Sequence, residues 1–299
     1  MNRMKKITKA VIPVGGEGSR MFPISNAFPK EFVPLKDSFG NIKPAIMYLL
    51  EELDSAGIKE IYIMVTKKWQ NDFYEHFFFE DLSDFCKDKL TAWQMKYFRK
   101  IKKISKKIKI YFNKDIHGFG HVLYHCNNFI KDEPFLLLLG DQIYRSNTNC
   151  SCIKQILDNY DGNLTITASK VPLDDVNKYG IMSGKYTTSN SFIISNIKEK
   201  PTKLYAKKYL KMSYENSDTY FSVFGTYILN KKILLDAKRF FDSKKKLDSE
   251  YQLTPFLENY KDKKIAFIPD GKYFDIGNFE SYNEAYILFQ MDSKERQLN

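Results

Sequence analysis

Short apolar runs separated by longer amphipathic stretches recur along the first half of the chain. Runs too short for a helix predict buried strands at residues 10–14, 60–65, 109–112 and 134–139. Helical spacing predicts helices at residues 46–56, which end before Gly57, and at 91–110, the longest helical stretch. This alternation predicts a largely parallel sheet with helices on both faces.

The pattern changes after about residue 160. Shorter strands are predicted at 164–169, 191–197, 220–229 and 264–269, a loop at 171–179, and helices at 231–241, 249–260 and 278–290. The chain shows neither an internal repeat nor a linker, and it ends in a polar stretch at 292–299. We therefore expect one domain made of two halves.

The 299 residues carry a formal net charge of +11, which makes an anionic ligand or a nucleic acid conceivable. Many of the lysines lie at 96–109, where they alternate with Ile101, Ile104 and Ile108 at helical spacing. We interpret this stretch as a solvated helix face over an apolar stripe. A nucleic-acid surface is the alternative, and a nucleic-acid partner is not expected.

Cysteine usage and hydropathy favour a cytoplasmic protein. The four cysteines show no C-x-x-C spacing, so we expect reduced thiols rather than disulfides or a cysteine metal site; they are Cys86, Cys126, Cys150 and Cys152. No apolar run approaches the length of a membrane span, and the basic N-terminus lacks the apolar core of a signal peptide. We expect no membrane partner.

The predicted strand at 10–14 runs into a glycine-rich loop, G-G-E-G-S-R, at residues 15–20. Without Cβ atoms, Gly15, Gly16 and Gly18 allow a bulky anion to approach the backbone N–H groups, and Arg20 adds a forked cation. The spacing fits neither a dinucleotide fingerprint nor a P-loop. We interpret the loop as a cradle for nucleotide phosphates; an ordinary tight turn is the alternative.

The same loop resembles the G-G-x-G-[ST]-R signature of the sugar nucleotidyltransferases, which a lysine follows, here Lys30. Residues 28–35 (F-P-K-E-F-V-P-L) and 43–45 (K-P-A) are similar to the P-K-E-x-x-P and K-P elements of the bacterial UTP–glucose-1-phosphate uridylyltransferases. The resemblance spans almost the whole chain. It implies an α/β fold of the nucleotide-diphospho-sugar transferase type, a Rossmann-like mixed, mainly parallel sheet flanked by helices. The implied nucleotide-binding half covers about 1–160 and the sugar-binding half about 161–291.

Two aspartates follow apolar runs. Asp141 comes after residues 135–140, so its carboxylate would stand at the end of a buried strand and need a partner such as a metal ion. A turn or helix cap is the alternative. Asp275, in Y-F-D-I-G, has the same character. The two segments resemble the family's L-G-D-x and Y-x-D-x-G elements, and the resemblance implies that both acids hold Mg²⁺.

Residues 198–201 (K-E-K-P) resemble the family's E-K-P element. That resemblance implies that Lys200 meets the sugar phosphate and that Glu199 bonds sugar hydroxyls. Gly180 would let the backbone lie close to the hexose. A solvated loop is the alternative. Residues 247–254 resemble the family's G-E-x-Q-L-T segment, and they also fit a helix capped by Ser249 with Gln252 at its third position.

The segment expected to read the base is residues 113–121 (N-K-D-I-H-G-F-G-H), which is similar to the family's Q-x-x-P-L-G-L-G-H. The resemblance implies that Asn113 and Gly118 contact uracil, with Gly120 a second position of close approach. Asn113 is one methylene shorter than the family's glutamine, which leaves the choice of base open. The His117, His121 and His125 stripe is not interpreted as a metal site, because no carboxylate is interleaved with it.

The resemblance implies a Mg²⁺-dependent transfer of a uridylyl group from UTP to glucose 1-phosphate, giving UDP-glucose and pyrophosphate. Arg20, Lys30 and Lys200 are the expected catalytic cations. Glu17 departs from the pattern as an acid in a phosphate loop and is expected to point to solvent. The alternatives are another nucleoside triphosphate, another sugar 1-phosphate, or a sugar-nucleotide-binding homologue with poor turnover. A homo-oligomer is compatible with the sequence.

Overall fold

The computed structural model describes residues 6–37, 40–243 and 251–295, of which 290–295 are described by their backbone alone. The chain divides into two compact units and passes between them several times. Unit 1 comprises residues 1–7, 116–139 and 144–273, and unit 2 comprises 8–115, 140–143 and 274–299. The expected halves met near residue 160, whereas residues 116–139 and 144–160 belong to unit 1 and the late segment that begins at Phe274 belongs to unit 2.

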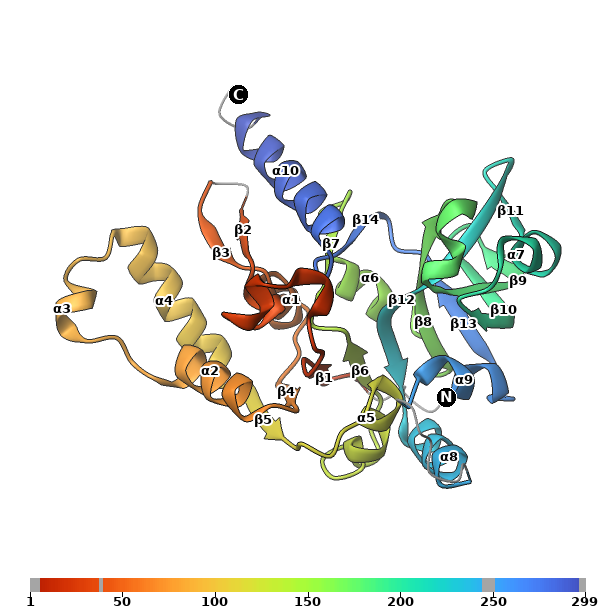
Figure 1. The fold of residues 1–299 in the computed structure, drawn as a ribbon, viewed down its shortest axis with the longest axis horizontal. Coiled ribbons are helices and arrows are strands. Elements are labelled where there is room, and N and C mark those ends of the chain that lie inside the picture. Colours follow the sequence, from red (N-terminus) through yellow and green to blue (C-terminus); the bar gives the residue numbers. More distant parts are fainter. Residues whose placement is uncertain (1–5, 38–39, 244–250, 296–299) are drawn as a thin grey trace. The chain divides into compact units, whose positions relative to one another are not determined.

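Unit 2 is built on three parallel strands in the order β5–β4–β1 (Figure 1). They are β1 (Lys9–Pro13), β4 (Glu60–Val65) and β5 (Ile108–Phe112), with the short hairpin strands β2 (Pro34–Lys36) and β3 (Ile42–Pro44) beside them. The helices are α1 (Ile46–Ser55), α2 (Lys68–Phe79), α3 (Asp84–Lys87), α4 (Ala92–Ser105) and α10 (Phe279–Glu295). Three short 3-10 helices follow β1: η1 (Ser19–Met21), η2 (Ile24–Asn26) and η3 (Lys30–Phe32). The strands predicted near the N-terminus are confirmed to within a residue.

The helix predicted at 91–110 ends earlier, at Ser105, and the chain enters β5 two residues after its C-cap, Lys106. Its start is fixed by a capping box in which Thr91 and Gln94 each bond the other's backbone N–H. Lysines and isoleucines continue the helical spacing past residue 105, but pairing of Ile108 with Ile61 in the sheet overrides it. The longest helix is α10 rather than α4.

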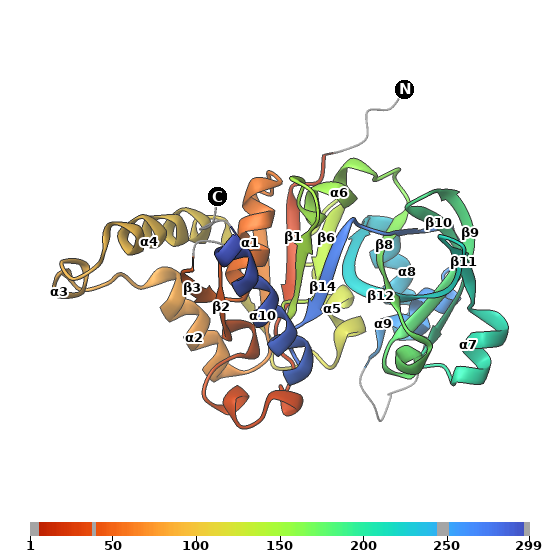
Figure 2. The ribbon, with the colours of Figure 1, turned by 90° about the horizontal axis from the view of Figure 1, so that it is seen from above.

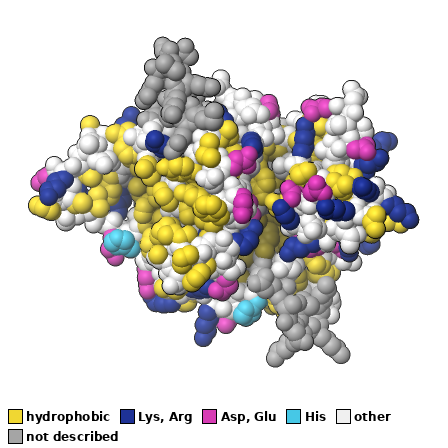
Figure 3. All heavy atoms as spheres, turned by 45° about the horizontal axis from the view of Figure 1, so that its top comes forward, with side chains coloured by type: hydrophobic (Ala, Val, Ile, Leu, Met, Phe, Trp, Pro, Cys, Tyr) yellow, Lys and Arg dark blue, Asp and Glu magenta, His cyan; other side chains and the backbone are white. Residues whose placement is uncertain are grey.

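Several of the lysines at 96–109 form ion pairs with acids of unit 2. Lys103 and Lys107 lie 3.3 Å and 2.5 Å from the Asp54 carboxylate, and Lys109 lies 2.6 Å from Glu60. On the face shown in Figure 3, Lys and Arg are interspersed with Asp and Glu. A polyanion needs unbalanced positive charge, so these pairs favour the solvated-face interpretation.

Unit 1 holds a mixed sheet in the order β6–β12–β8–β13–β10–β9. Its strands are β6 (Phe135–Leu138), β8 (Leu164–Val171), β9 (Gly180–Thr188), β10 (Ser191–Glu199), β12 (Ser217–Leu229) and β13 (Lys264–Phe267), with β11 (Met212–Tyr214) paired to β12. The β8–β13 ladder is parallel. Strand β12 is antiparallel to β6 and β8, and strand β10 is antiparallel to β13 and β9. The mixed sheet with flanking helices confirms the α/β class; the expected parallel pairing is found in unit 2 and in the β8–β13 ladder, whereas the other ladders of unit 1 are antiparallel.

The helices of unit 1 are α5 (Phe119–Cys126), α6 (Cys152–Asp158), α7 (Lys203–Tyr209), α8 (Lys231–Asp242) and α9 (Leu253–Asn259), with the 3-10 helix η4 (Leu173–Lys178) inside the predicted loop. Helices α5, α8 and α9 pack together (Figure 1), and β9, β10 and α7 lie at one end of the unit (Figure 2). The strands β7 (Gln142–Ser146) and β14 (Gly271–Asp275) pair as a two-stranded ribbon.

Two predictions at helix ends need correction or fall outside the described residues. The helix predicted at 249–260 begins at Leu253, and Gln252 is its N-cap rather than its third residue. Ser249 lies outside the described residues, as do the rest of 244–250 and the last four residues of the polar stretch, 296–299. The predicted stretch at 292–299 begins inside α10. Among the described residues, no helix is both long and apolar enough to cross a bilayer.

One hydrophobic cluster of unit 2 positions the chemistry described below. It joins Val33 and Leu35 after η3 to Ile143 in β7 and to Phe274 and Ile276, the neighbours of Asp275. Phe274 and Ile276 are fully buried. Because close-packed side chains leave little room for displacement, Asp275 is held rigidly between them.

Candidate active site

The glycine-rich loop leaves β1 and is shaped by its neighbours. A Cβ on Gly15 would overlap the side chain of Thr66, whose hydroxyl donates a hydrogen bond of 3.0 Å to the Gly15 carbonyl. A Cβ on Gly16 would lie 3.3 Å from the Lys30 ammonium. Gly18 has φ +68°, a left-handed conformation that favours glycine. Packing against Thr66 thus explains why residue 15 is a glycine, and the left-handed backbone explains why residue 18 is one. Gly16 lies next to the Lys30 ammonium.

Lys30, at the start of η3, forms an ion pair with Asp141, three residues beyond the end of β6. The side chains are 15% and 12% exposed, so water screens the pair weakly. Burial lowers the pKa of Lys30, but the carboxylates of Asp141 and Glu31 outweigh it and hold the pKa above its usual value. The ammonium therefore stays charged at neutral pH.

Arg20 in η1 donates a hydrogen bond of 3.0 Å to Asp275 at the end of β14. The guanidinium is 58% exposed and the carboxylate only 9% exposed. The other oxygen of Asp275 accepts the Gly277 N–H at 2.9 Å. One cation of the loop is thus already directed at an acid from the far end of the sequence.

Asp141 and Asp275 face the same point in unit 2. A Cβ on Gly277 would lie 2.6 Å from an Asp141 oxygen, 2.9 Å from an Asp275 oxygen and 3.2 Å from the Arg20 guanidinium. The backbone joins the two segments as well, since the Ile276 N–H donates to the Asp141 carbonyl at 2.9 Å. The structure therefore brings together the two predicted metal ligands and both predicted triphosphate cations.

Two hard carboxylates on one point suit a Mg²⁺ ion, which prefers oxygen ligands and keeps several waters. Within the part of the chain that the structure describes, no group of three or more His, Cys, Asp or Glu side chains could hold a metal. Two acids leave positions for water and phosphate oxygens, which is how Mg²⁺ binds at phosphoryl-transfer sites. The residues present fit the ion.

Glu31 and Tyr74 were not singled out in the sequence. Glu31 is 1% exposed, lies between Lys30 and the core residue Phe32, and packs its Cγ against Gly140. Burial raises the pKa of Glu31 to about 7, against the opposing effect of the Lys30 ammonium. The Tyr74 hydroxyl donates to Glu31 at 3.5 Å, and burial raises the pKa of this phenol well above its usual value. The sequence feature that could have identified Glu31 as a site residue is its position directly after Lys30.

The two residues predicted to read the base lie in different units. Asn113 follows β5 in unit 2, and its side-chain oxygen accepts the Asp115 N–H at 2.8 Å. Gly118 lies in unit 1 as the N-cap of α5, with φ +86°. A Cβ on Gly120 would lie within 3 Å of the Tyr251 and Gln252 carbonyls. The close approach at Gly120 is therefore to its own chain.

The residues predicted for the sugar phosphate lie together in unit 1. Gly180 in β9 pairs with Glu199 in β10, and a Cβ on Gly180 would lie 3.0 Å from a Glu199 carboxylate oxygen. Lys200 is exposed, its N–H donates to the Tyr179 carbonyl at 3.0 Å, and its φ is +42°. A left-handed lysine is strained, and strain of this kind gathers at functional sites.

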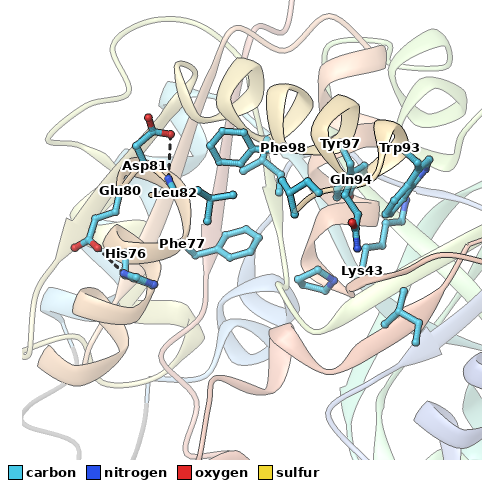
Figure 4. Close-up of a pocket in the computed structure, with 14 residues that line it drawn as sticks. Lys43, His76, Phe77, Glu80, Asp81, Leu82, Trp93, Gln94, Tyr97 and Phe98 are labelled. Atoms are coloured by element: carbon cyan, nitrogen blue, oxygen red, sulfur yellow. Dashed lines mark hydrogen bonds and ion pairs between the residues drawn. The ribbon is translucent and has the colours of Figure 1, made fainter. Parts of the chain in front are cut away.

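A separate apolar hollow of about 360 Å³ lies in unit 2 between α2, α4 and β3 (Figure 4). Phe77, Trp93 and Phe98 line it, and among its lining residues the His76 ring nitrogen and the Glu80 carboxylate are hydrogen-bonded. None of the residues predicted to bind the nucleotide is among those that line it. Its size is at the lower end for small-molecule pockets, and nothing in its lining resembles a phosphate site.

Known proteins are similar to this chain along nearly its whole sequence. A family model described as nucleotidyl transferase matches residues 9–290. The chain is 31% identical over 299 residues to a UTP–glucose-1-phosphate uridylyltransferase of Bacillus subtilis (strain 168), covering 98% of this chain and 94% of the relative. A protein of the same name from Staphylococcus epidermidis (strain ATCC 12228 / FDA PCI 1200) is 30% identical over 301 residues, covering 98% and 95%.

Solved structures give the corresponding result for the fold. A UDP-glucose pyrophosphorylase complexed with UDP-glucose matches with a TM-score of 0.76 at 27% identity, covering 95% of this chain and 99% of the other. An apo-UDP-glucose pyrophosphorylase matches with a TM-score of 0.79 at 26% identity, covering 97% and 99%. The α/β fold implied by the resemblance is thereby confirmed.

Proposed function

Because this chain belongs to the nucleotidyl transferase family, we propose that it transfers a uridylyl group from UTP to glucose 1-phosphate, with UDP-glucose and pyrophosphate as products. The observation that carries the proposal is the likeness, over 98% of the chain, to a UTP–glucose-1-phosphate uridylyltransferase. The cluster of two acids and two cations around Gly277 supports it, because these are the groups that nucleotidyl transfer requires.

We assign the triphosphate to the glycine-rich loop and its cations. The N–H groups of Gly15, Gly16 and Gly18 would meet phosphate oxygens, and Arg20 and Lys30 would neutralise their charge. The raised pKa of Lys30 supports this role, since the ammonium is charged throughout the neutral range. We assign the base to Asn113 and Gly118.

We assign Mg²⁺ to Asp141 and Asp275. When bound, the ion supplies positive charge to the phosphate oxygens that the two cations do not reach. The carboxylates now hold Lys30 and Arg20. In the loaded enzyme these cations would exchange a carboxylate partner for phosphate, which costs little because one charge-assisted bond replaces another.

The sugar phosphate is assigned to Lys200, with Glu199 bonding sugar hydroxyls and Gly180 leaving room for the hexose. A phosphate oxygen of glucose 1-phosphate attacks the α-phosphorus of UTP in line; a new P–O bond forms as the bond to pyrophosphate breaks. A sugar phosphate is already an anion at neutral pH, so no side chain needs to remove a proton. Catalysis then consists of positioning and charge neutralisation.

A panel of UTP, dTTP, CTP and ATP against glucose 1-phosphate and N-acetylglucosamine 1-phosphate tests the proposal. Pyrophosphate release gives the rate and mass spectrometry the product. We expect UTP with glucose 1-phosphate to have the highest kcat/KM, and a chelator to abolish turnover until Mg²⁺ is restored. Preference for another triphosphate or sugar would replace the substrate assignment. Nucleotide binding without pyrophosphate release would favour a poorly active homologue.

We also propose that the enzyme works in the cytoplasm. None of the four cysteines, all within the described residues, forms a disulfide, as expected in a reducing compartment. Both proposed substrates are small soluble anions, which suits a chain of net charge +11.

A further inference from the structure

Glu17 is an acid within the glycine-rich loop, where the proposed ligand is a triphosphate. The sequence predicts that it points to solvent, and its side chain is 77% exposed. Its carboxylate nevertheless has a partner, the Lys67 ammonium at 2.6 Å. A carboxylate this close to a polyanion weakens the binding of that polyanion unless its charge is neutralised.

Lys67 belongs to the segment that already holds the loop. It directly follows Thr66, which fills the space beside Gly15 and donates to its carbonyl. Thr66 and Lys67, which directly follow β4, therefore bond the loop at two points. Thr66 bonds the Gly15 carbonyl, and Lys67 bonds the Glu17 carboxylate. The Thr66 contact fixes the conformation of the loop at Gly15, and the Lys67 contact neutralises the charge of Glu17.

The charge balance around the loop makes the second contact important. Before the nucleotide binds, the two cations assigned to the triphosphate are each paired with an acid, which balances their positive charge. Glu17 would then leave the site one charge more negative. Lys67 balances the charge of Glu17, and its side chain is only 28% exposed, so water screens it less than a fully exposed surface lysine.

We propose that Lys67 is a positioning residue for the nucleotide, which neutralises Glu17 and holds its carboxylate away from the phosphates. This inference rests on the proposed function only in requiring a nucleoside triphosphate at the loop. An exposed ion pair contributes little to folding. The effect is therefore expected in nucleotide affinity rather than in stability.

A double-mutant cycle separates neutralisation from direct phosphate binding. The variants are Lys67→Met, Glu17→Gln and the two combined, and the readouts are UTP binding with Mg²⁺ by calorimetry, KM for UTP, and kcat. We expect Lys67→Met to weaken UTP binding about tenfold with kcat within about twofold, because an uncompensated charge then faces the phosphates. Glu17→Gln alone should leave affinity unchanged or improve it.

The double variant gives the decisive result. We expect its affinity to return to within about threefold of the unaltered protein, since both charges are gone. A double variant as weak as Lys67→Met would mean that Lys67 contacts phosphate itself and would overturn the proposal. Unchanged binding by Lys67→Met would overturn it too. The defect should also shrink as salt is raised.

Lys68→Met is the matched control. It removes the same charge one residue along, where Lys68 pairs with Asp72 on the exposed face of α2, and we expect less than about a twofold effect on affinity. Thermal midpoints of all variants check folding. If the unaltered protein prefers another triphosphate, the cycle run with that nucleotide tests the inference, and the uridylyl assignment alone falls. Failure to bind any triphosphate would overturn both.

Discussion

Arg20 donates a hydrogen bond of 3.0 Å to Asp275, although 255 positions separate the two residues. Lys30 and Asp141 form a second pair of the same kind, 111 positions apart. In each pair a cation assigned to the triphosphate holds an acid assigned to the metal. Before any ligand binds, each of these cations is therefore paired with one of the two acids. Removing one side chain of a pair leaves the charge of the other without its hydrogen-bonded partner.

Asp141→Asn should lower kcat/KM by at least about a hundredfold, because it removes a proposed metal ligand without changing volume. It also removes the charged hydrogen-bond partner of the weakly exposed Lys30, so we expect a loss of about 2 kcal/mol in the free energy of unfolding. Pyrophosphate release and urea unfolding measure the two effects. Asp158→Asn, in an exposed pair on α6, is the control and should change neither. Substantial retained activity would contradict the metal role.

Gly277→Ala should separate the two acids without removing either. The new methyl group would overlap a carboxylate oxygen of each and approach the Arg20 guanidinium. We expect the Mg²⁺ concentration for half-maximal rate to rise by about tenfold, since misplacement by about 1 Å at a site that positions reactants is costly. A titration of rate against Mg²⁺ measures this. An unchanged titration would show that the two carboxylates do not act on one ion.

Glu31→Gln should change how stability depends on pH. The folded-state pKa of Glu31 is raised from 4.5 to about 7, so the protonated acid favours the folded state. That contribution is fully present below pH 4.5, declines as pH rises, and is lost above about 7, with a total of at most about 3 kcal/mol. Glutamine mimics the protonated form and should remove the decline. Urea unfolding from pH 4.5 to 8 compares the proteins; parallel curves would contradict the prediction.

Lys200→Gly and Lys200→Ala should separate charge from backbone strain. Both remove the ammonium, so both should raise KM for glucose 1-phosphate by at least about tenfold. With φ at +42°, glycine should make the protein about 1 kcal/mol more stable than alanine does. Steady-state kinetics and urea unfolding provide the readouts. Lys198→Ala, two residues earlier and 3.7 Å from Glu258, is the kinetic control. Equal stability of the two variants would contradict the strain argument.

Lys43→Met should destabilise the packing between α1, α4 and β3. Lys43 is 7% exposed, its ammonium lies 2.8 Å from Glu51 and 3.9 Å from the centre of the Tyr48 ring, and it lines the hollow of Figure 4. Glu51 would keep bonds to Tyr97 and Lys100 but lose its closest cation. We expect a loss of about 3 kcal/mol, less when combined with Glu51→Gln because the neutral side chain does not need the ammonium that the Lys43 change removes. Denaturant unfolding tests both, and additive losses would contradict the coupling.

The sequence by itself determined the parts that depend on local spacing. Apolar runs marked β1, β4 and β6 to within a residue, because a buried strand is a short-range pattern. The motifs around Arg20, Lys30 and the two aspartates predict phosphate and metal chemistry, because phosphate and metal sites need particular residue types. Helix ends were less well predicted: α4 stops where its chain joins the sheet, and Gln252 rather than Ser249 precedes α9.

Only the tertiary structure decided which of these residues meet. The pairing of Arg20 with Asp275, the burial of Glu31 beneath Gly140, and the space that Gly277 leaves for two acids depend on segments that are distant in the sequence. The partner that makes Glu17 tolerable, Lys67, is 50 positions away on another strand end. Such contacts arise from how β1, β4 and the returning chain pack. A local sequence pattern shows which residues are charged. Packing decides which opposite charge each of them meets and how much water screens the pair.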